Sequence, residues 1–241
     1  MSIIKYLQLP FQFEPLKLQE ATVALSSEYW QAHYQTLHYN GSWTAIPLRS
    51  TDGQADNIFI NPAKNNSYAD TIFLKQSPYF KKVLDSFQCP LLAVRLLKLN
   101  AGASIKEHRD NDLFFEKGEI RIHIPIITNA DVEFYLDSER MNLQEGSCWY
   151  MNFNLLHAIQ NNGNTDRVHL VIDAQVNNWV KNLFNSSAIK TRKEIQAKPE
   201  HSLSVQIQII AQLRILNTEV SNKLADEMEN KIKSDENIKD K

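Results

Sequence analysis

The sequence predicts a mainly β domain of the sandwich or barrel type, flanked by helices. From residue 91 to residue 177 it contains short runs rich in β-branched and aromatic residues, and glycine- or asparagine-rich turn segments separate them. The predicted strands are Leu92–Leu99, Glu119–Ile127, Val132–Leu136, Cys148–Phe153 and Val168–Gln175. With 241 residues and 43% hydrophobic residues, the chain is long enough for one large domain with an appendage.

The chain divides into three segments that differ in composition and in hydrophobic periodicity. Residues 1–89 contain helical periodicity over 14–35 and 68–87, which we expect to give helices packed on the core. Between them lies a segment rich in turn formers that holds Trp43 and Arg49, large side chains that we expect to contact a ligand. Residues 90–180 form the predicted β core, and residues 181–241 a helical extension with a polar tail.

Composition narrows the range of partners. The net charge is −2 and no basic block interleaves with aromatic residues, so we expect no nucleic acid as partner. No apolar run reaches the length of a spanning helix, and the first residues do not read as a secretion signal. The two cysteines lie in apolar contexts, which favours reduced, buried thiols. We therefore expect a cytoplasmic protein without membrane contact.

Metal-binding residues occur in a characteristic order within the β segment. His108 and Asp110 form an H-x-D triplet, whose side chains share one face of an extended segment, and His157 follows 49 residues later. This is the order of a facial triad of two histidines and one carboxylate, which leaves positions of Fe(II) open for O₂ and a chelating cosubstrate. Arg167, ten residues after His157, is a candidate anchor for a dicarboxylate.

Other polar residues of the segment allow more than one role. In the strand around Ile122, Arg121 and His123 lie on one face and the isoleucines on the other. His123 is either a site residue or a core histidine bonded to backbone, and His169, on the same face as Arg167, is either a supporting or a structural residue. We expect the histidines outside the β segment at the surface: His33, His38 and His201.

These linked motifs, together with the segment from Asn40 to Arg49, resemble the aspartyl/asparaginyl β-hydroxylase family of Fe(II)/2-oxoglutarate dioxygenases, and most of all its small bacterial proline hydroxylases. The resemblance implies a double-stranded β-helix (cupin) core. It also implies that His108, Asp110 and His157 bind iron and that Arg167 holds the distal carboxylate of 2-oxoglutarate. Arg121 and His123 would line the cosubstrate or substrate side. The best-known animal members of the family lack the carboxylate ligand, whereas this sequence has Asp110 at that place.

The resulting hypothesis is a hydroxylase that uses Fe(II), 2-oxoglutarate and O₂ on an amino acid or an amino-acid side chain, of L-proline-like or Asp/Asn-like type. Arg95 is the candidate for a substrate carboxylate and Trp43 for its apolar face, and we assign no catalytic residue beyond the metal ligands. The alternative is a non-catalytic metal-binding cupin that acts as a sensor or interaction module. A cupin with another metal and another reaction, such as an isomerase, also stays open.

The C-terminal extension carries an amphipathic pattern from about Ser202 to Lys223, with its apolar stripe at Ile209, Leu213, Leu216, Val220 and Leu224. Such a stripe is usually covered in water-soluble proteins. It either packs on the N-terminal helices or pairs with a second subunit, and we favour a homodimer because the polar segment 186–200 reads as a linker. The last residues, 227–241, read as a frayed helix or a disordered tail.

Overall fold

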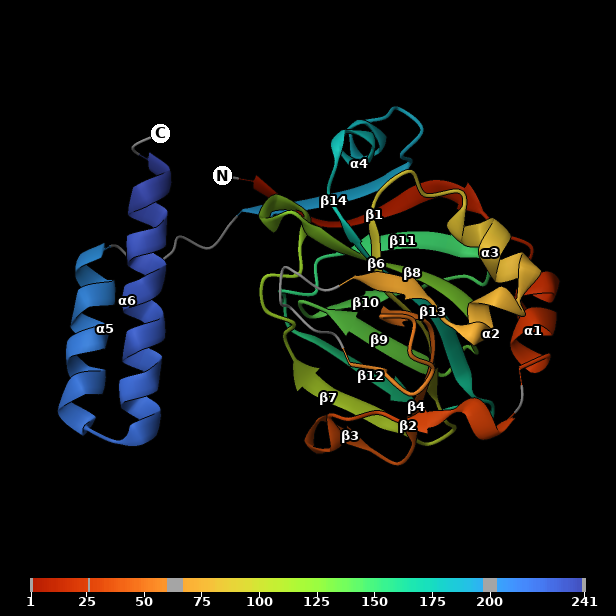
Figure 1. Cartoon of the computed structure of the whole chain (residues 1–241), viewed down its shortest axis with the longest axis horizontal. Coiled ribbons are helices and arrows are strands. Elements are labelled where there is room, and N and C mark those ends of the chain that lie inside the picture. The colour runs from red at the N-terminus through yellow and green to blue at the C-terminus, as the bar shows by residue number, and fades with distance from the viewer. Residues whose placement is uncertain (1, 26, 60–66, 197–202, 240–241) are drawn as a thin grey trace. The chain divides into compact units, whose positions relative to one another are not determined.

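The computed structural model describes residues 2–25, 27–59, 67–196 and 203–239, in two compact units. The larger unit, Ser2–Ile195, contains all the β-strands apart from the last residue of the final one (Figure 1). The smaller unit, residues 196–241, contains two helices. We call the larger unit the β unit and the smaller one the helical hairpin.

Two antiparallel sheets build the β unit. The large sheet has the order β14 (Thr191–Gln196), β1 (Ser2–Gln12), β11 (Ser147–Met151), β8 (Glu119–Ile127), β13 (Arg167–Gln175), β6 (Leu91–Leu99), β4 (Trp43–Thr51), β2 (Gln31–Ala32), and β5 (Tyr68–Asp70) pairs with β4. The small sheet has the order β10 (Glu139–Met141), β9 (Val132–Leu136), β12 (His157–Asn161), β7 (Ser104–His108), β3 (Tyr39–Asn40). This is the predicted double-stranded β-helix, and the prediction of fold class is confirmed.

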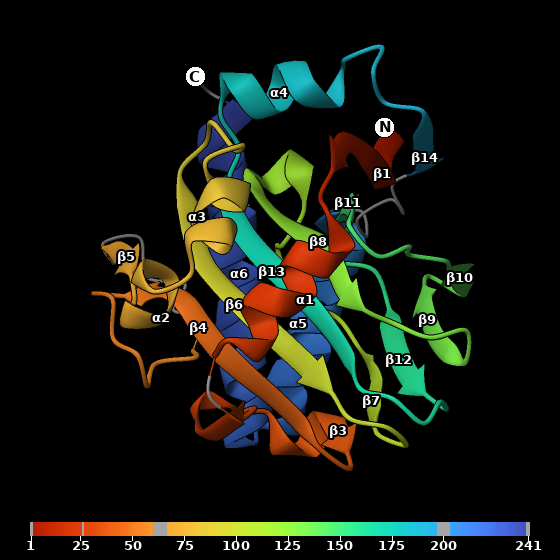
Figure 2. The ribbon, with the colours of Figure 1, turned by 90° about the vertical axis from the view of Figure 1, so that its right-hand side faces the viewer.

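Each face of the large sheet contributes to its own apolar cluster, because side chains alternate along a strand. One cluster contains Ile122 and Ile124 of β8 and packs under α1 (Pro15–Val23), α2 (Ile72–Lys75), α3 (Pro78–Leu84) and α4 (Asn178–Phe184). The other lies between the sheets and includes Leu99, Phe134 and Val171. Figure 2 shows α1 and α3 over the large sheet, while the small sheet lies on its other side.

The predicted strands match β6, β8, β9, β11 and β13 to within two residues at either end. The N-terminal segment differs from the prediction, because residues 1–89 also supply β1 and β4 to the large sheet. The expected helix over residues 14–35 ends at Val23, and that over 68–87 is split into α2 and α3. The structural unit therefore extends well beyond residues 90–180, since hydrogen bonding to distant strands outweighs local periodicity.

The segment 186–200 is not simply a linker. Its residues 191–196 form β14, the edge strand that lies beside β1 in the large sheet. Residues 197–202 lie outside the described ranges. The amphipathic pattern of the extension gives two helices rather than one, α5 (Leu203–Leu216) and α6 (Glu219–Lys239). In the part of the chain that the structure describes, no helix combines the length and apolarity needed to cross a membrane.

Candidate metal centre

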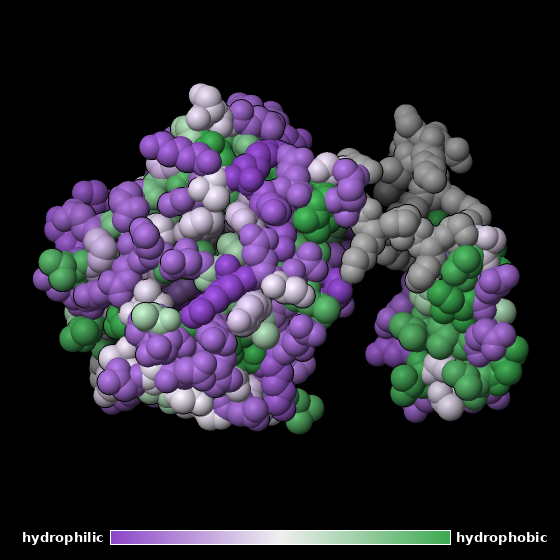
Figure 3. Space-filling view, turned by 180° about the vertical axis from the view of Figure 1, so that it is seen from behind, coloured by the Kyte–Doolittle hydropathy of each residue, from purple (hydrophilic) through white to green (hydrophobic). Residues whose placement is uncertain are grey.

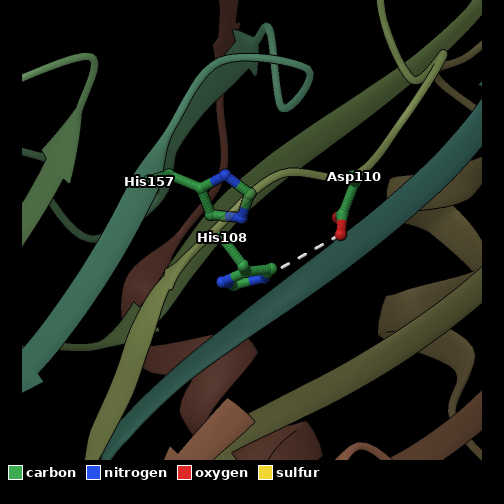
Figure 4. A group of neighbouring side chains, drawn as sticks. All are labelled: His108, Asp110 and His157. Carbon is green, nitrogen blue, oxygen red and sulfur yellow. Dashed lines mark ion pairs between the residues drawn. The ribbon is translucent and has the colours of Figure 1, made fainter. Parts of the chain in front are cut away.

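The three predicted metal ligands converge at one end of the space between the sheets (Figure 4). His157 begins β12 and His108 ends β7, and the two residues face each other as register partners in the small sheet. Asp110 follows β7, where its backbone N–H donates to the carbonyl of Phe153 over 2.9 Å. One ligand atom from each of the three side chains lies within 4.8 Å of the other two, so a single ion can contact all three.

The hydrogen bonds of both histidines leave the correct nitrogen free for a metal. His108 Nδ1 lies 2.7 Å from the carbonyl oxygen of Lys106, and His157 Nδ1 lies 3.0 Å from that of Leu155. A carbonyl only accepts, so each Nδ1 carries the proton and each Nε2 keeps its lone pair. The donor set of two neutral imidazoles and one carboxylate therefore fits a divalent transition metal such as Fe(II).

The third ligand, Asp110, is held in its charged form. One of its oxygens, Oδ2, accepts a short hydrogen bond from Arg121 Nη1, which leaves Oδ1 available at 3.8 Å from His108 Nε2. Burial by itself would raise the pKa of the Asp110 carboxyl, but the positive charge of Arg121 brings it below its ordinary value. The carboxylate is thus ionised before any metal binds.

Asp173 on β13 joins two buried arginines behind the metal ligands. It accepts from Arg121 Nε over 2.6 Å and from Arg121 Nη2 over 3.0 Å, and it also accepts from Arg95 Nη2 over 3.2 Å. Asp173 and Arg95 are 2% and 3% exposed, so both charges are removed from water. Although burial opposes the charged form, Asp173 and Asp110 raise the pKa of Arg121 above its ordinary value. Asp173 thus orients Arg121, which in turn holds Asp110.

A second chain of polar contacts runs through Arg167, His169 and His123. Arg167 Nη2 lies 3.1 Å from His169 Nδ1, and His169 Nδ1 lies 3.2 Å from His123 Nδ1. A guanidinium only donates, so His169 Nδ1 is the acceptor and His123 Nδ1 must carry the proton. His123 Nε2 then keeps a lone pair, and this buried atom has no hydrogen-bond partner among the described residues. It is an acceptor that a bound molecule can use.

Arg167 carries a buried charge that the described residues do not neutralise. It is 3% exposed, its hydrogen bond is with the neutral His169, and none of the ion pairs among described residues includes it. Burial lowers the pKa of Arg167 to about 9. A buried guanidinium without a counter-charge is costly unless an anionic ligand supplies one, and a carboxylate matches its fork of donors.

A cavity connects these groups, and three of its side chains have unsatisfied polar atoms. Its lining includes the three predicted metal ligands together with Arg95, Arg121, Arg167, His123, Trp43 and His33. Three buried atoms of this lining have no hydrogen-bond partner among the described residues: Arg95 Nε and Trp43 Nε1, which are donors, and His123 Nε2, which is an acceptor. Leaving a buried polar group without a partner costs about 1–3 kcal/mol. The cavity is therefore suited to a ligand that carries both an acceptor and a donor.

Comparison with known proteins agrees with this geometry. The family model described as "Aspartyl/Asparaginyl beta-hydroxylase" matches residues 16–176, about two thirds of the chain. The chain belongs to the aspartyl/asparaginyl β-hydroxylase family. Among curated proteins it is similar to L-proline cis-4-hydroxylase of Rhizobium meliloti (strain 1021), with 22% identity over 194 residues, 78% of this chain and 68% of the relative.

Among solved structures, the chain is similar to an oxidoreductase of the 2OG-Fe(II) oxygenase family from Burkholderia pseudomallei, with 9% identity and a TM-score of 0.45. That match covers 67% of this chain and 79% of the other. It is also similar to a Pseudomonas putida prolyl-4-hydroxylase, with 9% identity and a TM-score of 0.42, over 72% of this chain and 94% of the other.

Several expectations for the site need correction. Trp43 is not on a loop but on β4, where it is buried and lines the cavity. Arg49, expected to contact a ligand, instead forms an ion pair with Asp70 and donates to the carbonyl of Tyr68. Arg121, expected on the cosubstrate or substrate side, lines the cavity and donates to Asp110 and Asp173. His201 lies outside the described residues.

The prediction that His33 lies at the surface is wrong. This residue is 3% exposed, its ring lies 3.5 Å from that of Trp43 between centroids, and it lines the cavity. Burial, together with the charge of Arg95, lowers the pKa of His33 to about 3. His38, also expected at the surface, is half buried, with its ring centroid 5.3 Å from that of His108. No local pattern marks these residues, because tertiary contacts such as those with Trp43 and His108 bury them.

The buried histidines predict a steep loss of stability in acid. Burial is the main cause that lowers the pKa values of His33, His123, His157 and His169, to about 4 for His157 and about 3 for His33. The unfolded chain binds protons more readily, so stability is complete above the ordinary histidine pKa and is lost as pH falls toward the folded values.

We expect the free energy of unfolding of the metal-free protein to be nearly constant from about pH 7 to 8. Below about pH 6 it should fall by roughly 1.4 kcal/mol per pH unit for each such histidine. Urea denaturation across this range measures it, and the variant His33→Asn should show a shallower slope. A constant free energy down to about pH 4.5 would contradict the burial of these rings as neutral groups.

Proposed function

We propose that the protein is an Fe(II)- and 2-oxoglutarate-dependent dioxygenase that hydroxylates an amino acid, free or as a side chain. One observation carries the proposal: the ligand atoms of His108, Asp110 and His157 lie within 4.8 Å of one another in a cavity that also contains the uncompensated charge of Arg167. A site for metal alone does not need a buried arginine nearby. A cosubstrate with two carboxylates, one of them distant from the metal, does.

The metal site requires little rearrangement to bind iron. His108 and His157 present Nε2 lone pairs, and Asp110 is charged and fixed by Arg121. When bound, Fe(II) with 2-oxoglutarate supplies the oxygen-activating chemistry that no amino-acid side chain provides. The contribution of the chain is to orient the ligands, to keep bulk water out with apolar walls such as Phe153, and to position the substrate.

Arg167 is the proposed partner of the distal carboxylate of 2-oxoglutarate. We expect Arg167→Lys to raise the apparent KM for 2-oxoglutarate, since lysine keeps the charge but loses the two-point fork. Loss of one charge-assisted hydrogen bond costs about 1.5–3 kcal/mol, or roughly 10- to 150-fold in affinity.

Titration of 2-oxoglutarate at saturating amino acid and Fe(II) measures this change. The exposed Arg192 of β14 offers a control, and Arg192→Lys should leave the KM unchanged. If Arg167→Lys also leaves it unchanged, the cosubstrate carboxylate binds elsewhere.

The unsatisfied atoms of the cavity favour an amino acid as substrate. Arg95 Nε and Trp43 Nε1 can donate to a carboxylate, and His123 Nε2 can accept from an ammonium or imino group. The charges leave room for a substrate carboxylate, because Arg95 and Arg121 share the carboxylates of Asp110 and Asp173 while Arg167 pairs with neither of them. The name of the similar L-proline cis-4-hydroxylase makes L-proline the first substrate to test.

A panel of substrates tests the assignment. L-Proline, L-aspartate and L-asparagine, each free and within a short peptide, are incubated with Fe(II), 2-oxoglutarate and O₂, and the products are analysed by mass spectrometry. We expect one member to gain a single oxygen atom, and Arg95→Met to weaken its binding more than that of 2-oxoglutarate. Addition of oxygen to none of them would contradict the proposed substrate class.

A further inference from the structure

The C-terminal hairpin folds back on itself at Asn217 and Thr218. Asn217 has a φ of 46°, a left-handed conformation that ends helices. Thr218 and Ser221 then cap α6 reciprocally, since the backbone N–H of Ser221 donates to Thr218 Oγ1 over 3.1 Å and that of Thr218 to Ser221 Oγ over 3.0 Å. The apolar stripe expected on one helix is therefore distributed over two antiparallel helices.

The contact between α5 and α6 uses only part of their apolar surface. Ile210, Ser221 and Ala225 are buried in the hairpin. Arg214, the single charged residue of α5, donates to Asp226 and Glu229 of α6 over 2.6 Å and 3.1 Å. The hairpin thus satisfies the charge of α5 internally, and the remaining surface of α5 carries no charged side chain.

An uncharged groove runs along α5 on this remaining surface. It is lined by Ile209, Leu213 and Leu216 with the side-chain amides of Gln208 and Gln212. Leu216 is 66% exposed, and Figure 3 shows apolar side chains gathered on the hairpin. The helices α5 and α6 contain 14 and 21 residues. A pair of helices this small rarely forms a stable fold alone, so a hairpin with such a face needs a partner surface.

The features of this face favour a second copy of the same chain. Without charges, two identical faces meet across a two-fold axis without repulsion, and a glutamine amide can both donate to and accept from its symmetry mate. The described surface of the β unit offers no matching stripe, because its exposed large hydrophobic residues are scattered, with at most two on any one element. They are Leu16, Val23, Leu37, Phe59, Ile72 and Tyr135.

We propose that the chain forms a homodimer in which the α5 groove of one copy packs on that of the other, so that the two hairpins make a four-helix bundle. This arrangement buries the apolar stripe of one copy against the same stripe of the other, as in the core of four-helix bundles. The dimer keeps Arg214 and its two carboxylate partners on the far side of the interface. It does not depend on the metal centre or on the proposed reaction.

Two neighbouring residues of α5 give a matched test in the full chain. Leu216 lines the groove, whereas Ile215, 73% exposed, does not. We expect Leu216→Lys and Ile209→Lys each to raise the dimer dissociation constant at least tenfold, and Ile215→Lys to leave it unchanged. Sedimentation equilibrium measures the constants, and circular dichroism verifies that the helices persist in each variant.

The unmodified chain should sediment at twice its mass of 27.8 kDa. A monomer at tens of micromolar protein would overturn the proposal. So would an oligomer that Leu216→Lys and Ile209→Lys do not weaken, or one that Ile215→Lys weakens equally. Turnover is not part of this test, so a failure here leaves the proposed function unaffected.

Discussion

We expect the substitution His157→Ala to abolish Fe(II)-dependent turnover, and His108→Ala to do the same. Each removes one of the two imidazole ligands, and the effect should exceed the roughly 10- to 100-fold that loss of an outer hydrogen-bond partner of a ligand costs. Asp110→Ala should keep weak metal binding, since both histidines remain. Anaerobic titration with Fe(II) and a turnover assay measure the two effects separately.

His38 provides the matched control for these variants. Its ring lies 5.3 Å from that of His108 between centroids, yet it does not belong to the ligand group. We expect His38→Ala to bind Fe(II) as the unmodified protein does. Turnover that persists in both His157→Ala and His108→Ala, with unchanged circular dichroism, would rule out the triad.

A second large effect is expected at Asp173. In the proposal this residue contacts neither the metal nor the substrate. Asp173→Asn leaves the guanidinium groups of Arg95 and Arg121 buried without their shared charge, and breaking a buried pair in this way costs about 3–5 kcal/mol. The free energy of unfolding from urea denaturation should fall by this amount. Metal affinity should fall as well, since Arg121 loses the partner that orients it toward Asp110.

The variant Asp85→Asn, also in the β unit, is the matched control for Asp173→Asn. The Asp85 side chain is 62% exposed and pairs with Lys81 over 3.2 Å at the end of α3, so Asp85→Asn should cost no more than about 1 kcal/mol. Equal losses for the two variants would show that the Asp173 network is not a desolvated charge cluster.

Strands with clear alternation were predictable from the sequence. In β8, the polar residues Arg121 and His123 line the cavity while Ile122 and Ile124 enter the opposite cluster, as the spacing predicts. The strand β1 was missed although it also alternates. It includes Lys5, which is only 4% exposed because it pairs with Glu139 over 2.9 Å, a partner that the sequence does not reveal.

The convergence of His108, Asp110 and His157 was predictable, because a facial triad needs specific residue types in a set order along the chain. Their supporting residues were not. Asp173 and His33 are ordinary by local pattern, and their roles depend on contacts with Arg121 and Trp43 across strands. The break in the C-terminal helix did have a local signal, since asparagine followed by threonine at Asn217 and Thr218 is typical of a helix end and a new N-cap.

The conversion of 2-oxoglutarate to succinate tests the central claim most directly. Purified protein is incubated with 2-oxoglutarate and O₂, with Fe(II) or with a chelator, without substrate and with each amino acid of the panel, L-proline first. Succinate is quantified beside the same reactions of His157→Ala. The proposed function predicts succinate that requires Fe(II), increases with a suitable amino acid and disappears in the variant. Succinate formed equally with chelator and in His157→Ala, or no succinate with any amino acid of the panel, would contradict it.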